Sequence, residues 1–299
     1  MAHITTDDGV RLYVEEAGAG DPILFLHEFG GHYLSWEPQL RHFTRRYRCI
    51  TYAARGWPPS DVPDGAASYS QARAADDAAA VLRGVGIARA HLVGLSMGAT
   101  AALEFGIRHP GLALSLTVAA GGGGGTTDPD KLRKFRDDCA ATADRIERDG
   151  LAAIAEIYCA TPSRTPYRDK DPRGWAEFKR QFTEGSARGR ALTMRGIQGA
   201  RTPFFARAAE LAAIDLPVLV IAGDEDDSTL ELALFLKRTV PRCGLAIVPR
   251  TGHTINLEEP AAFNRALEEF LHAVERGRWG PRDAREPFVL VPADTPAAR

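Results

Sequence analysis

Short, largely apolar runs recur along this chain at intervals that leave room for a helix between them. Runs of four or five such residues are typical of strands that are buried on both faces of a sheet. Segments with helical spacing separate them, such as the stretch that begins at Ser70 and the one that follows Pro260. The alternation predicts an α/β fold, with a mostly parallel central sheet and helices on both faces. The runs are residues 23–26, 90–93, 114–118, 218–222 and 245–248.

The pattern changes between residues 126 and 204, where helical spacing continues without a convincing strand. We therefore expect a helical cap over residues 126–204, inserted into an α/β core of residues 1–125 and 205–276. The glycines at 121–125 lack the GxGxxG and GK[ST] patterns of phosphate loops, and we interpret them as a hinge into the cap. Residues 277–299 are weakly patterned and predict a loosely packed C-terminal extension.

Composition narrows the functional classes. The 299 residues are 44% hydrophobic and 25% charged, with a net charge of −2. The balanced charge and scattered arginines argue against a nucleic-acid or membrane-surface partner, and no apolar run approaches the roughly 20 residues of a membrane span. The beginning of the chain lacks a signal-peptide pattern, so we expect a cytoplasmic protein. We expect free thiols and no metal site from four widely spaced cysteines, Cys49, Cys139, Cys159 and Cys243.

The pentapeptide Gly94-Leu95-Ser96-Met97-Gly98 follows the apolar run 90–93 and precedes an Ala-rich helical run. A Gly-x-Ser-x-Gly pattern on a strand–turn–helix is typical of a nucleophile elbow, in which a sharp turn lifts the serine hydroxyl above the sheet. The flanking glycines leave space for that turn. Ser96 is thus the candidate nucleophile.

A serine nucleophile needs a histidine base, and in this arrangement the base follows the serine along the chain. Only His109, His253 and His272 lie downstream of Ser96. His109 precedes a proline at a predicted helix end, and His272 falls on the last predicted helix. His253 follows a strand on the loop Thr251-Gly252-His253, where a catalytic base is expected.

The acid that orients the base is expected in the loop after the apolar run 218–222. That loop contains Asp224, Glu225, Asp226 and Asp227. Spacing from Gly223 favours Asp226, while Asp224 and Asp227 stay as alternatives.

The oxyanion hole needs two backbone N–H groups. One is expected from Met97, directly after the nucleophile. The other is expected from the loop after the strand at 23–26, which reads His27-Glu28-Phe29-Gly30-Gly31. We assign the second donor to Phe29.

These motifs, in this order and at this spacing, resemble the α/β-hydrolase fold superfamily, and specifically its cap-bearing bacterial esterases and lactonases. The resemblance covers residues 4 to 275. It implies Ser96 as nucleophile, His253 as base and Asp226 as acid, with a small-molecule substrate and no cofactor or metal. A homodimer is compatible with it.

Two positions depart from the pattern of that superfamily. Glu28 stands where glycine is usual, and its carboxylate either stiffens the oxyanion loop or points toward the catalytic pocket. Ala53 stands where an aspartate commonly supports the arginine at Arg55, so Arg55 needs another partner. His27, Trp36 and Trp57 are further candidates for supporting the site or touching the substrate. Cap aromatics are candidates for the pocket wall: Phe135, Tyr158, Tyr167, Trp175, Phe178 and Phe182.

A serine at the elbow excludes the haloalkane dehalogenase and epoxide hydrolase reactions of this fold, which require a carboxylate nucleophile. We expect a carboxylic ester or lactone hydrolase that forms an acyl-enzyme. The alternatives are a carbon–carbon hydrolase of ring-cleavage products or a cofactor-free haloperoxidase-type enzyme. A non-enzymatic ligand receptor on this fold is a third interpretation.

Overall fold

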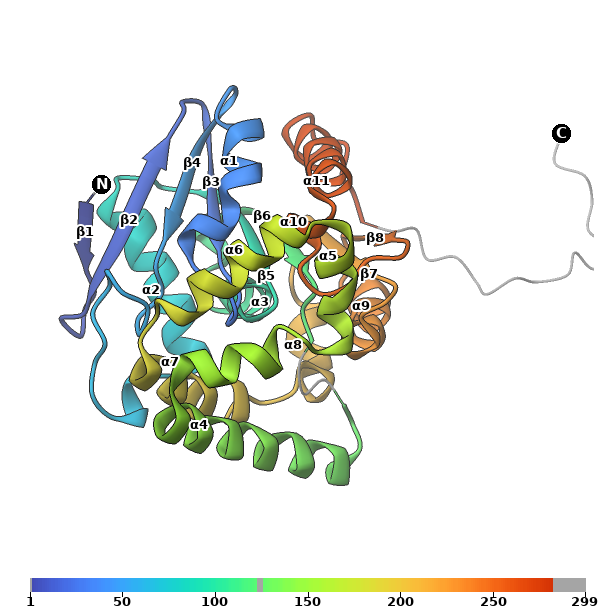
Figure 1. Cartoon of the computed structure of the whole chain (residues 1–299). Helices are drawn as coiled ribbons and strands as arrows, with labels where there is room; N and C mark the ends of the chain where they lie inside the picture. Colours follow the sequence, from blue (N-terminus) through green and yellow to red (C-terminus); the bar gives the residue numbers. More distant parts are fainter. Residues whose placement is uncertain (1, 123–125, 282–299) are drawn as a thin grey trace, which may run out of the picture.

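A computed structural model of the chain describes residues 2–122 and 126–281, and an eight-stranded sheet forms its centre (Figure 1). The spatial order is β1-β2-β4-β3-β5-β6-β7-β8. The β1–β2 and β2–β4 pairs are antiparallel, and every other neighbouring pair is parallel. The predicted, mostly parallel α/β sheet is confirmed. The strands are β1 Ala2–Thr5, β2 Arg11–Ala17, β3 Asp21–Leu26, β4 Tyr47–Tyr52, β5 Ala90–Leu95, β6 Ala113–Ala119, β7 Val218–Gly223 and β8 Cys243–Val248.

Both faces of the central strands are buried, which explains why these strands are largely apolar. Along β3, Leu24 and Leu26 join one core cluster, whereas Ile23 and Phe25 join another on the opposite face. The first cluster is covered by α2 (Gln71–Gly84), α3 (Met97–Arg108), α8 (Ala208–Ala212) and α9 (Asp227–Thr239). The second is covered by α1 (Glu37–Phe43), α10 (Ile255–Glu258) and α11 (Pro260–Glu275).

A further set of helices, residues 129–199, lies below and in front of the strands in Figure 1, and we call it the cap. The first cap helix is broken at Gly150, whose φ of 78° is not helical. The cap contributes to a third apolar cluster together with Phe29, Trp57 and Met97 of the core. Its elements are α4 Pro129–Tyr158, α5 Thr165–Lys170, α6 Pro172–Thr183, α7 Ala187–Thr193 and the π-helical turn η5 Met194–Gly199.

The parallel strands bring the candidate loops to one edge of the sheet. Leu26 at the end of β3 pairs with Gly94 of β5, Leu95 pairs with Ala119 of β6, and Gly223 of β7 pairs with Val248 of β8. The loops that follow these strands therefore start beside one another at the carboxyl edge, where open α/β sheets bind their ligands.

The start of the C-terminal extension is packed rather than loose. The Trp279 ring packs against Phe270, with centroids 4.7 Å apart, and its Nε1 donates to the carbonyl of Arg242 at 2.8 Å. Residues 282–299 of the extension and residues 123–125 of the predicted glycine hinge lie outside the described residues. Within the described part, no helix combines the length and apolar character that a membrane crossing needs.

Candidate active site

Ser96 lies on a strained turn between β5 and α3. Its φ of 52° and ψ of −107° are unusual for a residue with a side chain. The turn is held because Ser96 N–H donates to the Ala119 carbonyl of the neighbouring strand at 2.8 Å. A Cβ at Gly98 would overlap the Leu26 carbonyl oxygen, and a Cβ at Gly94 would overlap the Gly98 carbonyl. Only glycine at both positions lets α3 start this close to the sheet.

His253 and Asp226 are directly bonded. His253 Nδ1 lies 2.6 Å from Asp226 Oδ2, and Asp226 is 1% exposed. Ser228 and Thr229 also donate hydroxyl hydrogen bonds to this carboxylate. Burial raises the pKa of Asp226, but the charge of His253 and these hydrogen bonds outweigh burial and leave the pKa below its usual value. The ionised carboxylate keeps the imidazole proton on Nδ1, so Nε2 is free to accept a proton.

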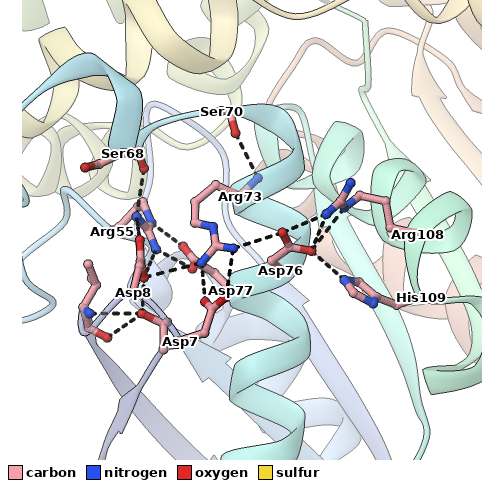
Figure 2. A network of polar contacts seen from close by, with 12 residues as sticks. Asp7, Asp8, Arg55, Ser68, Ser70, Arg73, Asp76, Asp77, Arg108 and His109 are labelled. Atoms are coloured by element: carbon pink, nitrogen blue, oxygen red, sulfur yellow. Dashed lines mark hydrogen bonds and ion pairs between the residues drawn. The ribbon is translucent and has the colours of Figure 1, made fainter.

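Among the described residues, no other acid or histidine named above is bonded to the His253 side chain. Asp224 accepts a hydrogen bond from the Thr251 amide at 3.3 Å, and Asp227 is exposed at the start of α9. His109 ends α3 and lies 2.7 Å from Asp76, as Figure 2 shows. Asp226 is thus the carboxylate that the structure places against His253.

The cap touches the loop that carries His253. The His253 amide donates to the Ser163 carbonyl at 2.7 Å, and Ser163 belongs to the short 3-10 turn η4 (Pro162–Arg164) between α4 and α5. Among the described residues, Ser96 Oγ has no hydrogen-bond partner; in ligand-free active sites, catalytic hydrogen bonds are often long.

The loop after β3 carries the second candidate oxyanion donor. Neither Phe29 N–H nor Met97 N–H has a hydrogen-bond partner among the described residues, so both are available to an oxyanion. His27 holds the loop in place: its Nδ1 lies 2.8 Å from the Glu28 carbonyl, and the Ala54 amide donates to its Nε2 at 3.0 Å. Burial lowers the pKa of His27 to about 3, so this ring is neutral and structural at neutral pH.

Glu28 pairs with a cap residue. Its carboxylate accepts two hydrogen bonds from Arg164, at 3.1 Å from Nη1 and 2.5 Å from Nη2, and both side chains are buried. Arg164 Nη2 also donates to the Tyr158 hydroxyl at 2.8 Å. Of the two roles left open for Glu28, this pairing favours stiffening of the oxyanion loop. Arg164 had no signal in the sequence that separated it from the other scattered arginines.

The two candidate tryptophans lie in different places. Trp57 Nε1 donates to the Gly31 carbonyl at 2.9 Å, and its ring packs edge-on against Phe29. Trp36 does not reach the site, contrary to our expectation: it is fully buried between the sheet and α11, against Phe25 and Phe263. Its spacing in the sequence could not show which face of the sheet it would cover.

Three aromatic residues of the cap, Tyr158, Phe178 and Phe182, pack against the oxyanion loop. Phe29 packs edge-on against Tyr158 and Phe182, with centroids 5.7 and 6.4 Å apart. A Cβ at Gly30 would come within 2.8 Å of Phe178 Cζ. These three rings are candidates for the pocket wall, as expected for cap aromatics.

Arg55 pairs with Asp77 of α2, in place of the aspartate that is common at the position of Ala53. It forms a fork with Asp77, from Nε at 2.6 Å and Nη2 at 2.7 Å, and also contacts Asp8 at the β1–β2 turn (Figure 2). The side chains of Arg55 and Asp77 are each 2% exposed. This network fixes the loop after β4, whose Ala54 amide holds His27.

Comparison with known proteins agrees with this fold. The profile of the alpha/beta hydrolase family matches residues 23–266. A putative 2-succinyl-6-hydroxy-2,4-cyclohexadiene-1-carboxylate synthase of Bacillus subtilis is 28% identical, over 91% of this chain and 98% of that protein. The 3-oxoadipate enol-lactonase 1 of Acinetobacter baylyi is 26% identical, over 91% of this chain and 97% of that protein.

A solved structure shows the same fold. The thermophilic esterase of Thermogutta terrifontis, determined with malate bound, superposes with a TM-score of 0.80 at 25% identity, over 91% of this chain and 98% of the esterase. Since the family profile spans most of the chain, the protein belongs to the alpha/beta hydrolase family and is a hydrolase.

Proposed function

We propose that the protein hydrolyses a small carboxylic ester or lactone through an acyl-enzyme on Ser96. The observation that carries the proposal is the 2.6 Å contact between His253 Nδ1 and Asp226 Oδ2, at the same edge of the sheet as a serine with φ 52°. A buried acid, an oriented imidazole and a serine hydroxyl on a strained elbow are the parts that acyl transfer requires. The names of the enol-lactonase and esterase relatives are in keeping with it.

In this mechanism Ser96 Oγ attacks the substrate carbonyl while His253 Nε2 takes its proton. The N–H groups of Phe29 and Met97 bind the oxyanion of the tetrahedral intermediate, and each such donor is worth about 3–4 kcal/mol in the transition state. His253 then protonates the leaving alkoxide. A water molecule, deprotonated by His253, attacks the acyl-enzyme. The second tetrahedral intermediate expels Ser96 Oγ, which regains a proton from His253, and the acid product is released. Asp226 stays ionised and stabilises the imidazolium in both steps.

The cap is proposed to cover the site and select the substrate. Ser163 and Arg164 bind the His253 loop and Glu28, and the rings of Tyr158, Phe178 and Phe182 lie over the oxyanion loop. Segments that close over a bound substrate are a common way to exclude water from an active site.

The test is a substrate panel on the purified protein and on Ser96→Ala. The panel contains p-nitrophenyl esters with two to eight acyl carbons, γ- and δ-lactones, and a ring-cleavage product with a carbon–carbon bond to be hydrolysed. We expect turnover of esters or lactones, and a loss of about 10³-fold or more in kcat in the variant. Circular dichroism checks that the variant is folded.

A result in which only the ring-cleavage product is turned over would replace the ester assignment with carbon–carbon hydrolysis. Turnover that survives in folded Ser96→Ala would remove the nucleophile assignment altogether.

A further inference from the structure

Residues 250–253, which we call the base loop, are held by hydrogen bonds from outside the catalytic residues. Arg250 has a φ of 53°, a left-handed conformation that residues with a side chain seldom adopt. The Gly252 amide donates to Glu258 Oε2 at 2.9 Å, and the next amide, that of His253, donates to the Ser163 carbonyl at 2.7 Å. Two successive N–H groups thus have fixed acceptors, and they orient the backbone from which the imidazole projects.

Gly252 lets the cap and the carboxylate approach the base loop closely. A Cβ at this position would overlap the Ser163 carbonyl oxygen and would stand 3.3 Å from Glu258 Oε2. On the core side, the Thr251 carbonyl accepts a hydrogen bond from the Glu225 amide at 3.0 Å. The base loop is therefore held from the core, from the cap and by Glu258 at the end of α10.

Glu258 takes its counter-charge from the cap. Lys170, the last residue of α5, places Nζ 2.9 Å from Glu258 Oε1. The Glu258 side chain is fully buried, whereas that of Lys170 is 32% exposed. Burial raises the pKa of Glu258 above its ordinary value, and the ammonium of Lys170 and the Gly252 amide oppose that rise. One oxygen of this carboxylate thus binds the cap while the other binds the base loop.

Lys170 also binds the base loop directly. Its Nζ donates to the Arg250 carbonyl at 2.7 Å and to Glu259 Oε1 at 2.6 Å. With Glu258, these acceptors use all three hydrogens of the ammonium. Among the described residues, the Glu259 side chain makes no hydrogen bond to the base loop. Glu258 and Glu259 therefore share the lysine but differ in their contact with the loop.

We propose that Lys170 and Glu258 are positioning residues for His253, so that the base is aligned for proton transfer only while α5 is packed against α10 and the base loop. The inference rests on the proposed function, in which His253 takes the proton of Ser96. Ser163 and Lys170 belong to one short segment, η4 followed by α5, which lies beside α10 (Figure 1). Their contacts with the base loop therefore form and break together. A shift of about 1 Å in a catalytic group can cost about 100-fold in rate.

The first test compares the two carboxylates that bind Lys170. Glu258→Met removes the acceptor of the Gly252 amide, and we expect kcat for a p-nitrophenyl ester to fall about 10- to 100-fold with KM unchanged. Glu259→Met removes the other carboxylate and should keep kcat. Equal losses of kcat in the two variants would mean that the lysine only anchors the cap, and they overturn the inference. An unchanged kcat in folded Glu258→Met also overturns it.

Lys170 supplies a second variant in case Glu258→Met does not fold, because its side chain is partly exposed. Lys170→Met should lose kcat as Glu258→Met does. Lys179→Met, at a cap lysine paired with Glu156, should keep kcat. Loss of the same size in both lysine variants overturns the positioning role.

Chemical rescue tests whether the ammonium itself is needed. Lys170→Cys is alkylated with 2-bromoethylamine, which rebuilds an ammonium at nearly the length of lysine, or with iodoacetamide, which adds a neutral group. The four native cysteines are buried, and mass spectrometry checks that only residue 170 is modified. Recovery of kcat with the amine alone supports the proposal. No recovery, or equal recovery with both reagents, overturns it.

A spectroscopic measurement separates failure of this inference from failure of the proposed function. The proton NMR signal of His253 Nδ1–H, assigned by its loss in Asp226→Asn, reports the position of the imidazole without turnover. We expect the signal to shift or broaden in Lys170→Met and to stay unchanged in Glu259→Met. If the wild type turns over no ester or lactone, this pattern still supports the positioning pair, and a signal unchanged in both variants overturns it. Ser96-dependent turnover with a wild-type kcat in Lys170→Met overturns the inference and leaves the hydrolase assignment intact.

Discussion

The guanidinium of Arg164 in the cap donates two buried hydrogen bonds, 3.1 and 2.5 Å long, to the carboxylate of Glu28 in the oxyanion loop. Glu28 directly precedes Phe29, the proposed oxyanion donor, and Ser163 next to Arg164 accepts a hydrogen bond from the His253 amide. One short cap turn thus contacts the oxyanion loop and the loop of the base. The position of the cap and the geometry of the site are therefore coupled.

Removing Glu28 should cost stability in a pH-dependent way. Glu28→Gln leaves the Arg164 cation buried without its counter-charge, and we expect the free energy of unfolding to fall by about 3–5 kcal/mol at neutral pH. Burial raises the pKa of Glu28, but the charge and hydrogen bonds of Arg164 outweigh it and hold the pKa below its usual value of 4.5. The ionised carboxylate thus stabilises the fold above pH 4.5, and this contribution is lost as the pH falls through the lower folded-state pKa.

Melting temperatures of the wild type and Glu28→Gln between pH 7 and pH 3.5 measure this effect. The gap between the two proteins is expected to be widest at neutral pH and to narrow below pH 4.5. Glu156→Gln is the control, because Glu156 is an exposed cap residue paired with Lys179. A gap that is constant across this range would contradict the account of Glu28.

Arg55 should not tolerate lysine. A single ammonium cannot reproduce the fork to Asp77 together with the contacts to Asp8, so Arg55→Lys is expected to lower the free energy of unfolding by about 2–4 kcal/mol. Arg11→Lys removes an exposed arginine fork to Asp61, which solvent screens, and should lower the free energy of unfolding much less than Arg55→Lys. Urea unfolding compares the two variants. Equal losses of unfolding free energy in the two variants would mean that burial does not strengthen the contribution of the Arg55 ion pairs.

Asp226 should matter far more than its acidic neighbours. Asp226→Asn replaces the ionised partner of His253 Nδ1 and is expected to lower kcat by about 10⁴-fold, because the imidazole loses its tautomer and its counter-charge. Asp227→Asn, on the adjacent exposed residue, should change kcat by less than about 3-fold. Steady-state kinetics on one ester suffices. A larger loss in Asp227→Asn than in Asp226→Asn would move the acid to another residue.

Ser96 should show backbone strain independently of activity. Glycine adopts φ 52° and ψ −107° without a Cβ, whereas alanine keeps the Cβ, so Ser96→Gly should be more stable than Ser96→Ala by about 1 kcal/mol. At the exposed helical residue Glu231 of α9, the same comparison should favour alanine by about 1 kcal/mol. Thermal unfolding of the four variants is the measurement. If alanine is favoured at both positions, the elbow is not strained.

The sequence could predict the sheet and the candidate Ser96, Asp226 and His253 because their signals are local. Apolar runs mark the strands, and each candidate lies three to five residues after the end of such a run. Parallel pairing then brings these loops to one edge, as Leu95 with Ala119 and Gly223 with Val248 illustrate.

Other features could not be predicted because they depend on packing between distant segments. Arg164 reaches Glu28 across 136 residues, and Arg190 reaches Phe29 across 161. Neither arginine differs from its neighbours in local pattern. The place of Trp36, one of the candidates for supporting the site, could not be predicted for the same reason: an aromatic residue after the loop that follows β3 can turn to either side of the sheet.

The central claim is that Ser96 is an acylated nucleophile, and covalent labelling tests it most directly. A fluorophosphonate probe is incubated with the wild type and with Ser96→Ala, and the modified peptide is identified by mass spectrometry while ester or lactone turnover is followed. We predict one adduct, on Ser96, that forms as turnover is lost, and neither adduct nor turnover in Ser96→Ala. Labelling of another residue, or labelling of Ser96 in a protein that turns over no ester or lactone, would contradict the account.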